Sequence, residues 1–562
     1  MTARTCMIFR RCWRRSWAYH WNGPPMRGFT LANLLRLALL WLALLGLAGL
    51  ARAQESPQFV DVSQAAGITA THRAVWDPDN AREGYLAIGQ AWGDYDRDGW
   101  LDLFVTGNLA PNRLYRNQGD GSFALSAHSP PLSLPDAPSG GATFADYDND
   151  GWLDLYIVNH GANHLFRNQA GAGFIDVTAR AGVGDRGKGS SAAWGDYDND
   201  GWLDLYVANW SCFPECEVVD FTRQADRLYH NNGDGSFSDV SATLGYMQTL
   251  GAGFAPAFVD YDNDGDLDLY VVNDKLQNEI GNLLWRNDGA GCAHWCWANV
   301  SAGSGANLLI NGMGLDAADY DNDGDFDLYI TDMVYTMYLL RNDGAGFRNR
   351  AHSAGVALNY GPDQAVGWGA AFFDYDNDGW QDLYVAATNY HQTFPELEVS
   401  FMNARPDALF RNDGAGGFVD VSADSGIAVD LPTLGVAYAD YDNDGDLDLV
   451  TGHWDSGYRL YQNQGADGRW LSLELRGGGA INADAVGSKV YVRAGGVTQL
   501  QTARIGSGLG GNNQLPLHFG LGAATSADIR IVWANGSECT IENVPANQRL
   551  RIVYGVTVGC GT

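Results

Sequence analysis

Basic residues, and lysine above all, are scarce in this 562-residue chain. Lys188, Lys275 and Lys489 are its only lysines, and 67 acidic residues outnumber 35 Lys and Arg, for a formal net charge of −32. A protein that neutralises a phosphate backbone needs clustered Lys and Arg. The composition therefore argues against nucleic acid as a partner.

Familiar catalytic arrangements are also missing from the sequence. The 11 histidines form no metal-spaced cluster, and no G-x-S-x-G or Cys/His protease pattern occurs. No pair of acids stands apart from the repeated aspartates described below as a general acid and base. The sequence therefore predicts a protein that is not an enzyme.

What the chain has in abundance is one acidic motif. Residues 94–102 read D-Y-D-R-D-G-W-L-D, and the pattern D-Y-D-x-D-G-x-x-D starts again at Asp146, Asp196, Asp260, Asp319, Asp374 and Asp440. Four carboxylates at positions 1, 3, 5 and 9, a Gly at position 6 for a sharp turn, and the carbonyl of position 7 suit a hard cation. The same ligands occur in the first part of an EF-hand loop, although no Glu follows at position 12.

One such turn between strands would be an ordinary hairpin turn. Seven copies that keep all four acids are different, because crowded like charges are costly unless a cation neutralises them. We therefore predict about seven Ca²⁺ sites. The predicted ligand residues are Asp94, Asp96, Asp98, Trp100 and Asp102 (loop 1); Asp146, Asp148, Asp150, Trp152 and Asp154 (loop 2); Asp196, Asp198, Asp200, Trp202 and Asp204 (loop 3); Asp260, Asp262, Asp264, Asp266 and Asp268 (loop 4); Asp319, Asp321, Asp323, Asp325 and Asp327 (loop 5); Asp374, Asp376, Asp378, Trp380 and Asp382 (loop 6); and Asp440, Asp442, Asp444, Asp446 and Asp448 (loop 7).

Four strand-like segments recur around each acidic loop. A small-residue segment precedes the loop, an apolar one follows it, a third ends in an N-D-G type of corner, and an F-x-D-V segment closes the unit. Seven such units predict an all-β fold, a seven-bladed β-propeller. The F-x-D-V segment at 59–63 precedes the first unit, so we expect it to complete the last blade and leave no open edge. Alternating apolar residues after 466 predict a small C-terminal β-domain.

The first 53 residues have the features of an export signal. Residues 37–50 are almost wholly apolar, and Ala51-Arg52-Ala53 has the A-x-A form of a cleavage site. We expect a signal peptide at 1–53, with Met26 as an alternative start, the propeller at 54–465 and the β-domain at 466–562. The expected location is the periplasm, the cell surface or the medium. An uncleaved segment would instead anchor the protein to the membrane.

Six cysteines follow residue 53, an even number that suits disulfides in an exported chain. Their spacing predicts two local pairs, Cys212 with Cys216 and Cys292 with Cys296, and leaves Cys539 with Cys560. Zinc is the alternative, but neither local pair has a His at finger-like spacing.

The longest insertions, at 210–226, 274–282 and 389–407, connect second and third strands, on the face opposite the acidic loops. Insertions on one face often mark the binding face of a repeat protein. Aromatic residues there could stack on sugars or hold a peptide, or they could pack their own loops. Polar residues there could instead end strands by bonding their own backbone. The candidate ligand-face residues are Trp210, Asn273, Asp332, Tyr390, His391, His453 and Trp454.

Two functions fit these features. The first is a non-enzymatic binding, adhesion or scaffold protein, in which calcium rigidifies the propeller and the insert-bearing face holds an extracellular protein or a surface glycan. The second is a calcium-dependent polysaccharide lyase or hydrolase that uses His391, His453, Tyr390 or Asp332. The scarcity of Lys and the scatter of these candidates favour the first function.

The small-residue segment followed by D-x-D-x-D-G-x-x-D resembles the FG-GAP (VCBS-type) repeats of integrin α-subunit propellers and of many exported bacterial proteins, over residues 59–465. The resemblance implies calcium in the acidic loops of one propeller face. Residues 463–554 resemble an ASPIC/UnbV domain, with His518-Phe519-Gly520-Leu521-Gly522 among the matching residues, but they depart from it at 508–514 and at Trp533-Ala534. The two modules together resemble the cartilage acidic protein-like family of exported proteins.

Overall fold

The computed structural model describes residues 59–72, 88–210, 225–245, 252–274, 280–292, 295–334, 336–358, 364–391, 400–403, 405–428, 430–454, 456–466, 468–506 and 508–557. The predicted signal peptide lies outside the described residues. Two compact units divide the chain, Met1–Glu55 and Ser56–Thr562, and the second contains every described residue.

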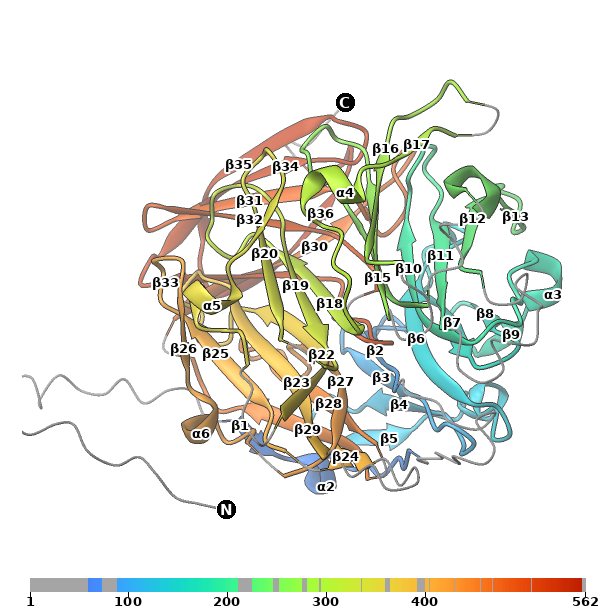
Figure 1. The fold of residues 1–562 in the computed structure, drawn as a ribbon, viewed down its shortest axis with the longest axis horizontal. Coiled ribbons are helices and arrows are strands. Elements are labelled where there is room, and N and C mark those ends of the chain that lie inside the picture. The colour runs from blue at the N-terminus through green and yellow to red at the C-terminus, as the bar shows by residue number, and fades with distance from the viewer. Residues whose placement is uncertain are drawn as a thin grey trace, which may run out of the picture. The chain divides into compact units, whose positions relative to one another are not determined.

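Seven antiparallel sheets, one for each repeat, form the blades of a β-propeller, which confirms the predicted fold (Figure 1). The first strands, which precede the acidic loops, are β2 (Gln90–Gly93), β6 (Ser139–Ala145), β10 (Gly189–Gly195), β14 (Gly253–Val259), β18 (Gly312–Ala318), β22 (Gln364–Phe373) and β27 (Thr433–Ala439). The second strands are β3 (Asp102–Val105), β7 (Asp154–Asn159), β11 (Asp204–Asn209), β15 (Asp268–Asn273), β19 (Asp327–Asp332), β23 (Asp382–His391) and β28 (Asp448–His453).

The outer half of each blade has the third and fourth strands. The third strands are β4 (Arg113–Asn117), β8 (His164–Asn168), β12 (Arg227–Asn231), β16 (Leu283–Asn287), β20 (Tyr338–Asn342), β25 (Ala408–Asn412) and β29 (Gly457–Asn463). The fourth strands are β5 (Phe123–Leu125), β9 (Phe174–Asp176), β13 (Phe237–Asp239), β17 (Trp297–Asn299), β21 (Phe347–Asn349), β26 (Phe418–Asp420) and β1 (Phe59–Asp61). An additional strand, β24 (Ser400–Asn403), pairs with β23.

The N-terminal strand closes the propeller. β1 pairs antiparallel with β29, with Phe59 opposite Asn463, so the last blade takes its fourth strand from the start of the repeat region. This confirms the closure expected from the F-x-D-V segment. Because β1 and the last repeat share one sheet, unfolding of either end of the repeat region breaks the same blade.

One short helix follows each fourth strand. These helices are α2 (Ser63–Ala66), η1 (Pro130–Leu132), α3 (Thr178–Ala181), η4 (Ser241–Leu244), α4 (Ser301–Ser304), α5 (Ala351–Ala354) and α6 (Ser422–Ser425). Among the described residues, no helix has the length and apolar character needed to cross a membrane.

A tyrosine at position 2 of every acidic loop packs between neighbouring blades. Its ring contacts the aromatic residue of the next blade's fourth strand, at centroid distances of 5.4–6.1 Å. Such contacts add to the burial of two large rings at each interface. The seven pairs are Tyr95–Phe174, Tyr147–Phe237, Tyr197–Trp297, Tyr261–Phe347, Tyr320–Phe418, Tyr375–Phe59 and Tyr441–Phe123.

The backbone of the same tyrosine is hydrogen-bonded to the next blade. The Asn that ends each third strand donates from Nδ2 to the carbonyl of this tyrosine, at 2.6–2.9 Å. The N-D-G type of corner predicts that these asparagines lie in hairpin turns, but the strand includes them, and the left-handed residues are the glycines that follow, such as Gly119 and Gly121. The seven bonds form a closed ring. They run from Asn117, Asn168, Asn231, Asn287, Asn342, Asn412 and Asn463 to Tyr441, Tyr95, Tyr147, Tyr197, Tyr261, Tyr320 and Tyr375, respectively.

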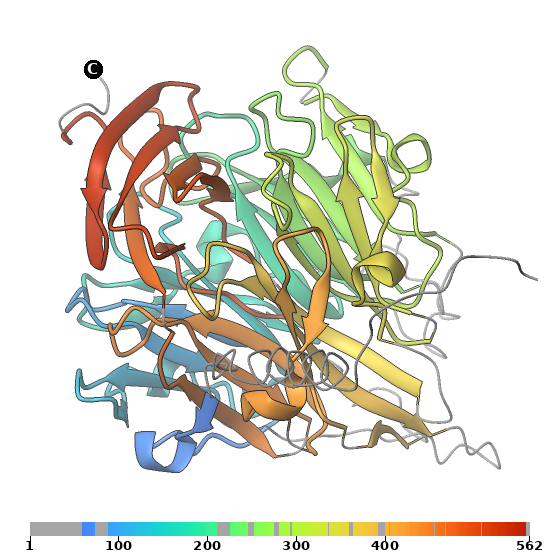
Figure 2. The same ribbon diagram turned by 90° about the vertical axis from the view of Figure 1, so that its left-hand side faces the viewer.

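The C-terminal residues form a second, smaller β-structure with its own core, the tail (red strands in Figure 2). Its strands are β30 (Arg469–Arg476), β31 (Lys489–Ala494), β32 (Val497–Thr502), β33 (Leu517–Gly522), β34 (Ser526–Val532), β35 (Glu538–Pro545) and β36 (Gln548–Val553). They make a three-stranded sheet in the order β33-β30-β36 and a four-stranded sheet in the order β32-β31-β34-β35. The predicted small C-terminal β-domain is therefore confirmed, but it packs in one unit with the propeller.

Candidate metal centres

Each acidic loop connects the first and second strands of its blade and closes on itself by hydrogen bonds. In loop 1, the Asp94 carboxylate accepts from the backbone N–H of Asp98 and of Gly99, at 3.1 and 3.0 Å. The Asp98 carboxylate accepts from the N–H of Trp100 at 3.0 Å. Position 4 has φ of 54–65° and the position-6 Gly 88–99° in all seven loops, so the predicted Gly supplies a turn that other residues rarely adopt.

The last acid of the loop is held from two sides. Asp102 is fully buried and accepts from the N–H of Asn117 at 2.9 Å and from the N–H of Tyr95 at 3.2 Å. Burial raises the pKa of Asp102 to about 9. The equivalent Asp268 has the same two bonds, and burial also raises its pKa to about 9. These acids fix the loop to the third strand.

Several loop carboxylates leave a buried oxygen atom without a hydrogen-bond partner. At position 3 these are the Oδ1 atoms of Asp96, Asp148, Asp198, Asp321, Asp376 and Asp442, and at position 1 those of Asp146, Asp260 and Asp440. A buried acceptor with no partner is costly unless a metal or another donor meets it.

The acids also converge. In loop 1, ligand atoms from Asp94, Asp96 and Asp102 lie within 4.8 Å of one another, and equivalent groups occur in loops 2 and 4. In loop 3 the acids at positions 1, 3 and 5 converge in this way. Carboxylate oxygens at such spacing are what a hard divalent cation binds. The donor set of the loops therefore fits calcium.

Basic side chains from the third strands occupy the outer oxygen atoms of the same acids. Arg116 lies 2.5 Å from Oδ2 of Asp96 and 2.5 Å from Oδ2 of Asp98. Arg167 pairs with Asp148 and Asp150, and Arg341 pairs with Asp321 and Asp323, in the same way. Because each Arg takes Oδ2, the Oδ1 atom of the position-3 acid remains directed elsewhere. Sequence reasoning missed these residues, although a basic or amide residue precedes every third-strand Asn.

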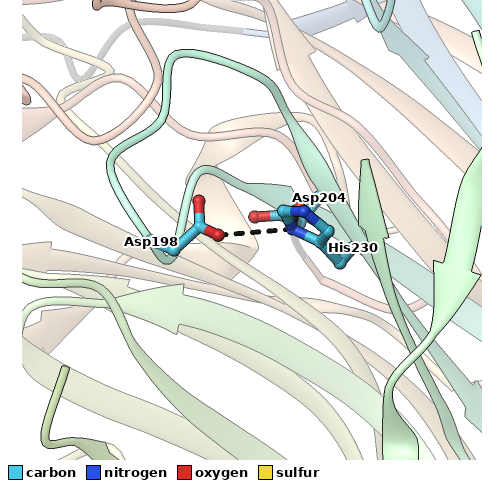
Figure 3. Close-up of side chains that lie close together, drawn as sticks. All are labelled: Asp198, Asp204 and His230. Carbon is cyan, nitrogen blue, oxygen red and sulfur yellow. Dashed lines mark ion pairs between the residues drawn. The ribbon is translucent and has the colours of Figure 1, made fainter. Parts of the chain in front are cut away.

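Loop 3 has a histidine in place of the arginine (Figure 3). His230 Nδ1 lies 3.3 Å from Oδ2 of Asp198 and 3.3 Å from Oδ1 of Asp204. The hydrogen bond to Asp204 raises the pKa of His230 to about 9. The imidazolium is therefore the counter-charge of this loop.

Burial and mutual repulsion shift the titration of several other loop acids. Burial, together with the charge of the neighbouring carboxylates, raises the pKa of Asp94 to about 6, of Asp319 to about 7 and of Asp196 to about 8. Four ionised carboxylates in one turn repel one another. The loops therefore need either protons or a cation at neutral pH.

The loops are also joined to one another. The position-4 asparagines of loops 2 to 7 donate from Nδ2 to position 6 or 7 of the following loop, at 2.6–3.3 Å. Loop 1 has Arg97 at this position, and its guanidinium lies 4.5 Å from the ring centroid of Trp152 in loop 2. These contacts join all seven loops into one ring. The sequence motif left position 4 unassigned, so it did not reveal this role of the residue there. The six donors are Asn149, Asn199, Asn263, Asn322, Asn377 and Asn443.

The tail rests on the loop face, which we define as the propeller face that carries loops 1–7. In loop 4, Lys489 Nζ lies 2.6 Å from Asp260 and donates to the side chain of Asn263 at 2.6 Å. In loop 7, Arg549 lies 2.7 Å from Asp440.

Loops 2 and 6 meet the tail through uncharged and acidic groups. The backbone N–H of Ala483 donates to Asn149 at 2.8 Å, and the N–H of Asp146 donates to the buried carboxylate of Asp484 at 2.9 Å. His518 Nε2 lies 2.6 Å from Oδ1 of Asn377. The tail therefore contacts position 4 in loops 2, 4 and 6.

The described candidate ligand-face residues are buried and bonded to other residues of the protein. Trp210 donates to Asp274 at 3.1 Å, and Asn273 donates to the carbonyl of Gly281 at 2.9 Å. His453 is fully buried, with Thr433 and Thr451 each 3.0 Å from a ring nitrogen, and burial lowers its pKa to about 3.

Asp332 is also buried and accepts from the N–H of Val334 at 2.9 Å. Trp454 is 7 % exposed, and its carbonyl lies 2.9 Å from His72 Nδ1. The side chains of Tyr390 and His391 lie outside the described residues. The arrangement of the five described residues favours the strand-ending and loop-packing role over direct ligand contact.

The sequence did not reveal a set of hydrogen bonds that cap the second strands on this opposite face. In six blades the N–H near the end of the second strand donates to a side chain that precedes the third strand, at 2.6–3.3 Å. In five of these six blades the signal is an Asn or Asp, one or two residues before the apolar residues of the third strand. In blade 5 a Met takes its place. The acceptors are Asn112, Asn163, Asp226, Asn282, Met337 and Asp407.

One predicted disulfide is present in full, between Cys292 and Cys296. Cys539 is buried and disulfide-bonded, and its predicted partner Cys560 lies outside the described residues. Cys212 and Cys216 lie outside them as well. The predicted pairing of these two stays a prediction.

Comparisons with known proteins agree with the resemblance stated above. A family model described as FG-GAP-like repeat matches residues 94–157, 146–207, 216–271 and 319–385. A model described as ASPIC and UnbV matches residues 478–558. Cartilage acidic protein 1 of Mus musculus is 25 % identical over 529 residues, which cover 86 % of this chain and 77 % of that protein. Cartilage acidic protein 1 of Xenopus tropicalis is 25 % identical over 506 residues, covering 84 % and 74 %.

The solved structures to which this chain is similar share little sequence identity with it. YCF48 from Cyanidioschyzon merolae gives a TM-score of 0.38 at 8 % identity, covering 70 % of this chain and 99 % of that chain. BBS1N in complex with ARL6DN gives 0.41 at 10 % identity, covering 73 % and 98 %.

Proposed function

We propose that this chain, which carries FG-GAP-like repeats followed by an ASPIC/UnbV domain, is an exported calcium-binding propeller that acts as a non-enzymatic binding scaffold. The observation that carries the proposal is the set of buried, unpartnered carboxylate oxygens at position 3 in six of the seven loops. Calcium held there would neutralise the acids and rigidify the turns that join neighbouring blades.

The residues that would hold each ion are the loop acids at positions 1, 3, 5 and 9, with the carbonyl of position 7. The arginines of the third strands would remain on the outer oxygens, where they already pair. An ion bound in this way supplies structure, since four carboxylates and a carbonyl leave little room for a substrate. The loops therefore support the scaffold and not a reaction.

The insert face, which we define as the propeller face opposite the loops, is proposed to bind the partner. The tail already contacts loops 2, 4, 6 and 7 on the loop face. The partner class is an extracellular protein or a glycan. Export is proposed because the relatives are named cartilage acidic protein and because the sequence begins with an expected signal peptide.

No observation favours the alternative of a polysaccharide lyase or hydrolase. Of its four candidate residues, His453 and Asp332 are buried and bonded to their surroundings, and neither faces solvent. The test is to incubate the exported protein, in calcium, with a panel of neutral and uronate-containing glycans and matrix proteins. Retention of a partner without any rise in the absorbance of unsaturated uronate supports the proposal. A calcium-dependent rise in that absorbance would replace the scaffold with a lyase.

A further inference from the structure

One segment of the tail lies where the first strands of the blades converge. Residues 503–506 and 508–514, between β32 and β33, are here called the channel segment. Its backbone is hydrogen-bonded to first strands of five different blades, which a segment this short can reach only near the propeller axis. The bonds, at 2.9–3.4 Å, are Asn512 with Gln90 and with Trp92, Gly510 with Ala142, Ile505 with Trp194, Gly508 with Leu315, and Gln514 with Tyr438.

The channel segment is shaped for this place. Gly510 has φ of 64°, and a Cβ atom there would lie 2.5 Å from the carbonyl oxygen of Gly140. Gly506 has φ of 94°, and its Cβ would lie 2.5 Å from the carbonyl oxygen of Ala192. Leu509 is fully buried within the propeller core. Any larger side chain at either position would collide with the backbone of a first strand and displace the segment. The close contacts therefore explain why both residues are glycines.

We propose that the tail is an internal ligand of the propeller, with the channel segment filling the centre from the loop face, and that cation loading of the loops holds it there. This inference rests on the proposed calcium binding. Removal of the cation would release the tail and expose the first strands of the blades. The ligand of the propeller centre is in this proposal the tail itself, residues 466–562 of the same chain.

The coupling follows from which loop groups the tail contacts. Asn149, Asn263 and Asn377 all lie at position 4, in the left-handed conformation that the closed turn maintains. They meet Ala483, Lys489 and His518 of the tail. When the cation leaves, the four carboxylates of each turn repel, and the turn no longer presents position 4 in this geometry.

Two tail cations act against this release, but they do not cover every loop. Lys489 and Arg549 each neutralise one of the acids in loops 4 and 7. Loop 2 instead meets the carboxylate of Asp484, whose partner Arg476 lies 3.1 Å away. A cation-free loop 2 therefore adds a repulsive contact between tail and propeller. We expect this repulsion and the loss of the three position-4 contacts to outweigh the two ion pairs, so that chelation weakens docking.

The test is to cleave the full-length protein between propeller and tail and to ask whether the two pieces stay together. A protease site is inserted after Gly465, which is exposed and lies between the last propeller strand and β30. After cleavage in calcium, size-exclusion chromatography should recover both pieces in one peak. In chelator, the tail should elute separately. Calcium content is measured on the same samples by elemental analysis.

A matched pair of variants tests the role of the channel segment. Gly510 and Gly495 have similar φ values, 64° and 59°, so alanine costs similar backbone strain at both. A Cβ at Gly495 meets no atom within 4 Å. After cleavage in calcium, Gly510→Ala should lose the tail and Gly495→Ala should keep it.

The outcomes distinguish a failure of tail docking from a failure of the proposed calcium binding. Co-elution in chelator, from samples that lost their calcium, overturns the cation dependence of docking. Co-elution of the Gly510→Ala pieces overturns the channel segment as the anchor. If Gly510→Ala does not fold, hydrogen exchange of residues 503–514 in uncut wild type replaces it, and equal protection with and without calcium is the contrary result. Samples that hold no calcium in the first arm contradict the proposed function itself.

Discussion

Buried acids lie at both ends of the blades, and the two ends treat them differently. At the insert face, Asp407 is buried and accepts from Tyr384 at 2.6 Å, from Thr433 at 2.8 Å and from the N–H of Ala387 at 2.9 Å. At the loop face, Asp376 in the same blade is buried and keeps Oδ1 without a partner. One carboxylate is satisfied by the protein, and the other requires something the protein does not supply.

The difference separates two uses of a buried aspartate. Asp226 and Asp407 bond the backbone at the end of a strand, which is a structural cap. The loop acids are grouped, mutually repulsive and incompletely bonded, which is why we propose a cation site there. Burial alone does not distinguish the two uses, so the proposal depends on convergence together with an unpartnered oxygen.

The largest expected effect comes from removing calcium. In chelator, the melting temperature of the exported protein should fall by at least about 10 °C relative to saturating calcium, because several linked sites lose their stabilisation together. Differential scanning calorimetry measures the fall, and magnesium at the same concentration is the control. Equal melting temperatures in calcium and chelator would remove the distinction between the two ends.

The pH dependence should change sign with calcium. Without the cation, the raised pKa values of the loop acids, about 9 for Asp102 and about 7 for Asp319, mean that the folded state binds more protons than the unfolded state. Stability should therefore rise as the pH falls from 9 to 6 in chelator.

With calcium bound, the acids are ionised and protons compete with the cation. Stability should then fall over the same pH range in calcium. Melting temperatures at three pH values in each condition measure the two slopes. Slopes of the same sign in calcium and chelator would contradict the assignment of these acids to a cation.

Two variants in blade 6 compare the ends directly. Asp376→Asn should remove one calcium from the chain and about 2.7 kcal/mol of the stabilisation that calcium provides at 100 times its dissociation constant. Asp407→Asn, on the insert face, should leave the calcium content unchanged. Equilibrium dialysis followed by elemental analysis measures both. A lost calcium in Asp407→Asn, or an unchanged content in Asp376→Asn, would reverse the comparison.

The smallest effect concerns the ring of interblade bonds at the loop end. Asn231 donates to the carbonyl of Tyr147 at 2.9 Å, and Asn231→Ala should cost about 1–3 kcal/mol because that buried carbonyl loses its donor. The neighbouring Asn232 is exposed, and Asn232→Ala should change stability by less than about 0.5 kcal/mol. Urea unfolding in calcium measures both, and equal losses would show that the ring adds nothing.

The sequence was sufficient for the features that repeat locally. Seven copies of D-Y-D-x-D-G-x-x-D, each between two strand-like segments, predicted the loops, the blades and the closure by Phe59–Asp61. The spacing of Cys292 and Cys296 predicted their disulfide. The loops and the disulfide depend on residues close together in the chain, so a pattern shows them, whereas the closure was predicted from an F-x-D-V segment that precedes the first repeat.

Features that depend on distant residues were not predictable in the same way. The position-4 asparagines recur in six of the seven loops, but only the neighbouring blade shows what they bond. The channel segment departs from the family pattern, and its contacts with Gln90 and Leu315 join residues far apart in the chain. Histidine is a common residue type at ligand-binding sites, and only the fold shows that His453 is buried.

The most direct test of the account is a calcium count. The exported protein is dialysed against millimolar free calcium, and bound calcium per chain is measured by elemental analysis against a chelator-treated sample. The account predicts about seven calcium ions per chain, one for each loop. A count of zero or one would mean that the unpartnered carboxylate oxygens are not cation ligands, and it would contradict the central claim.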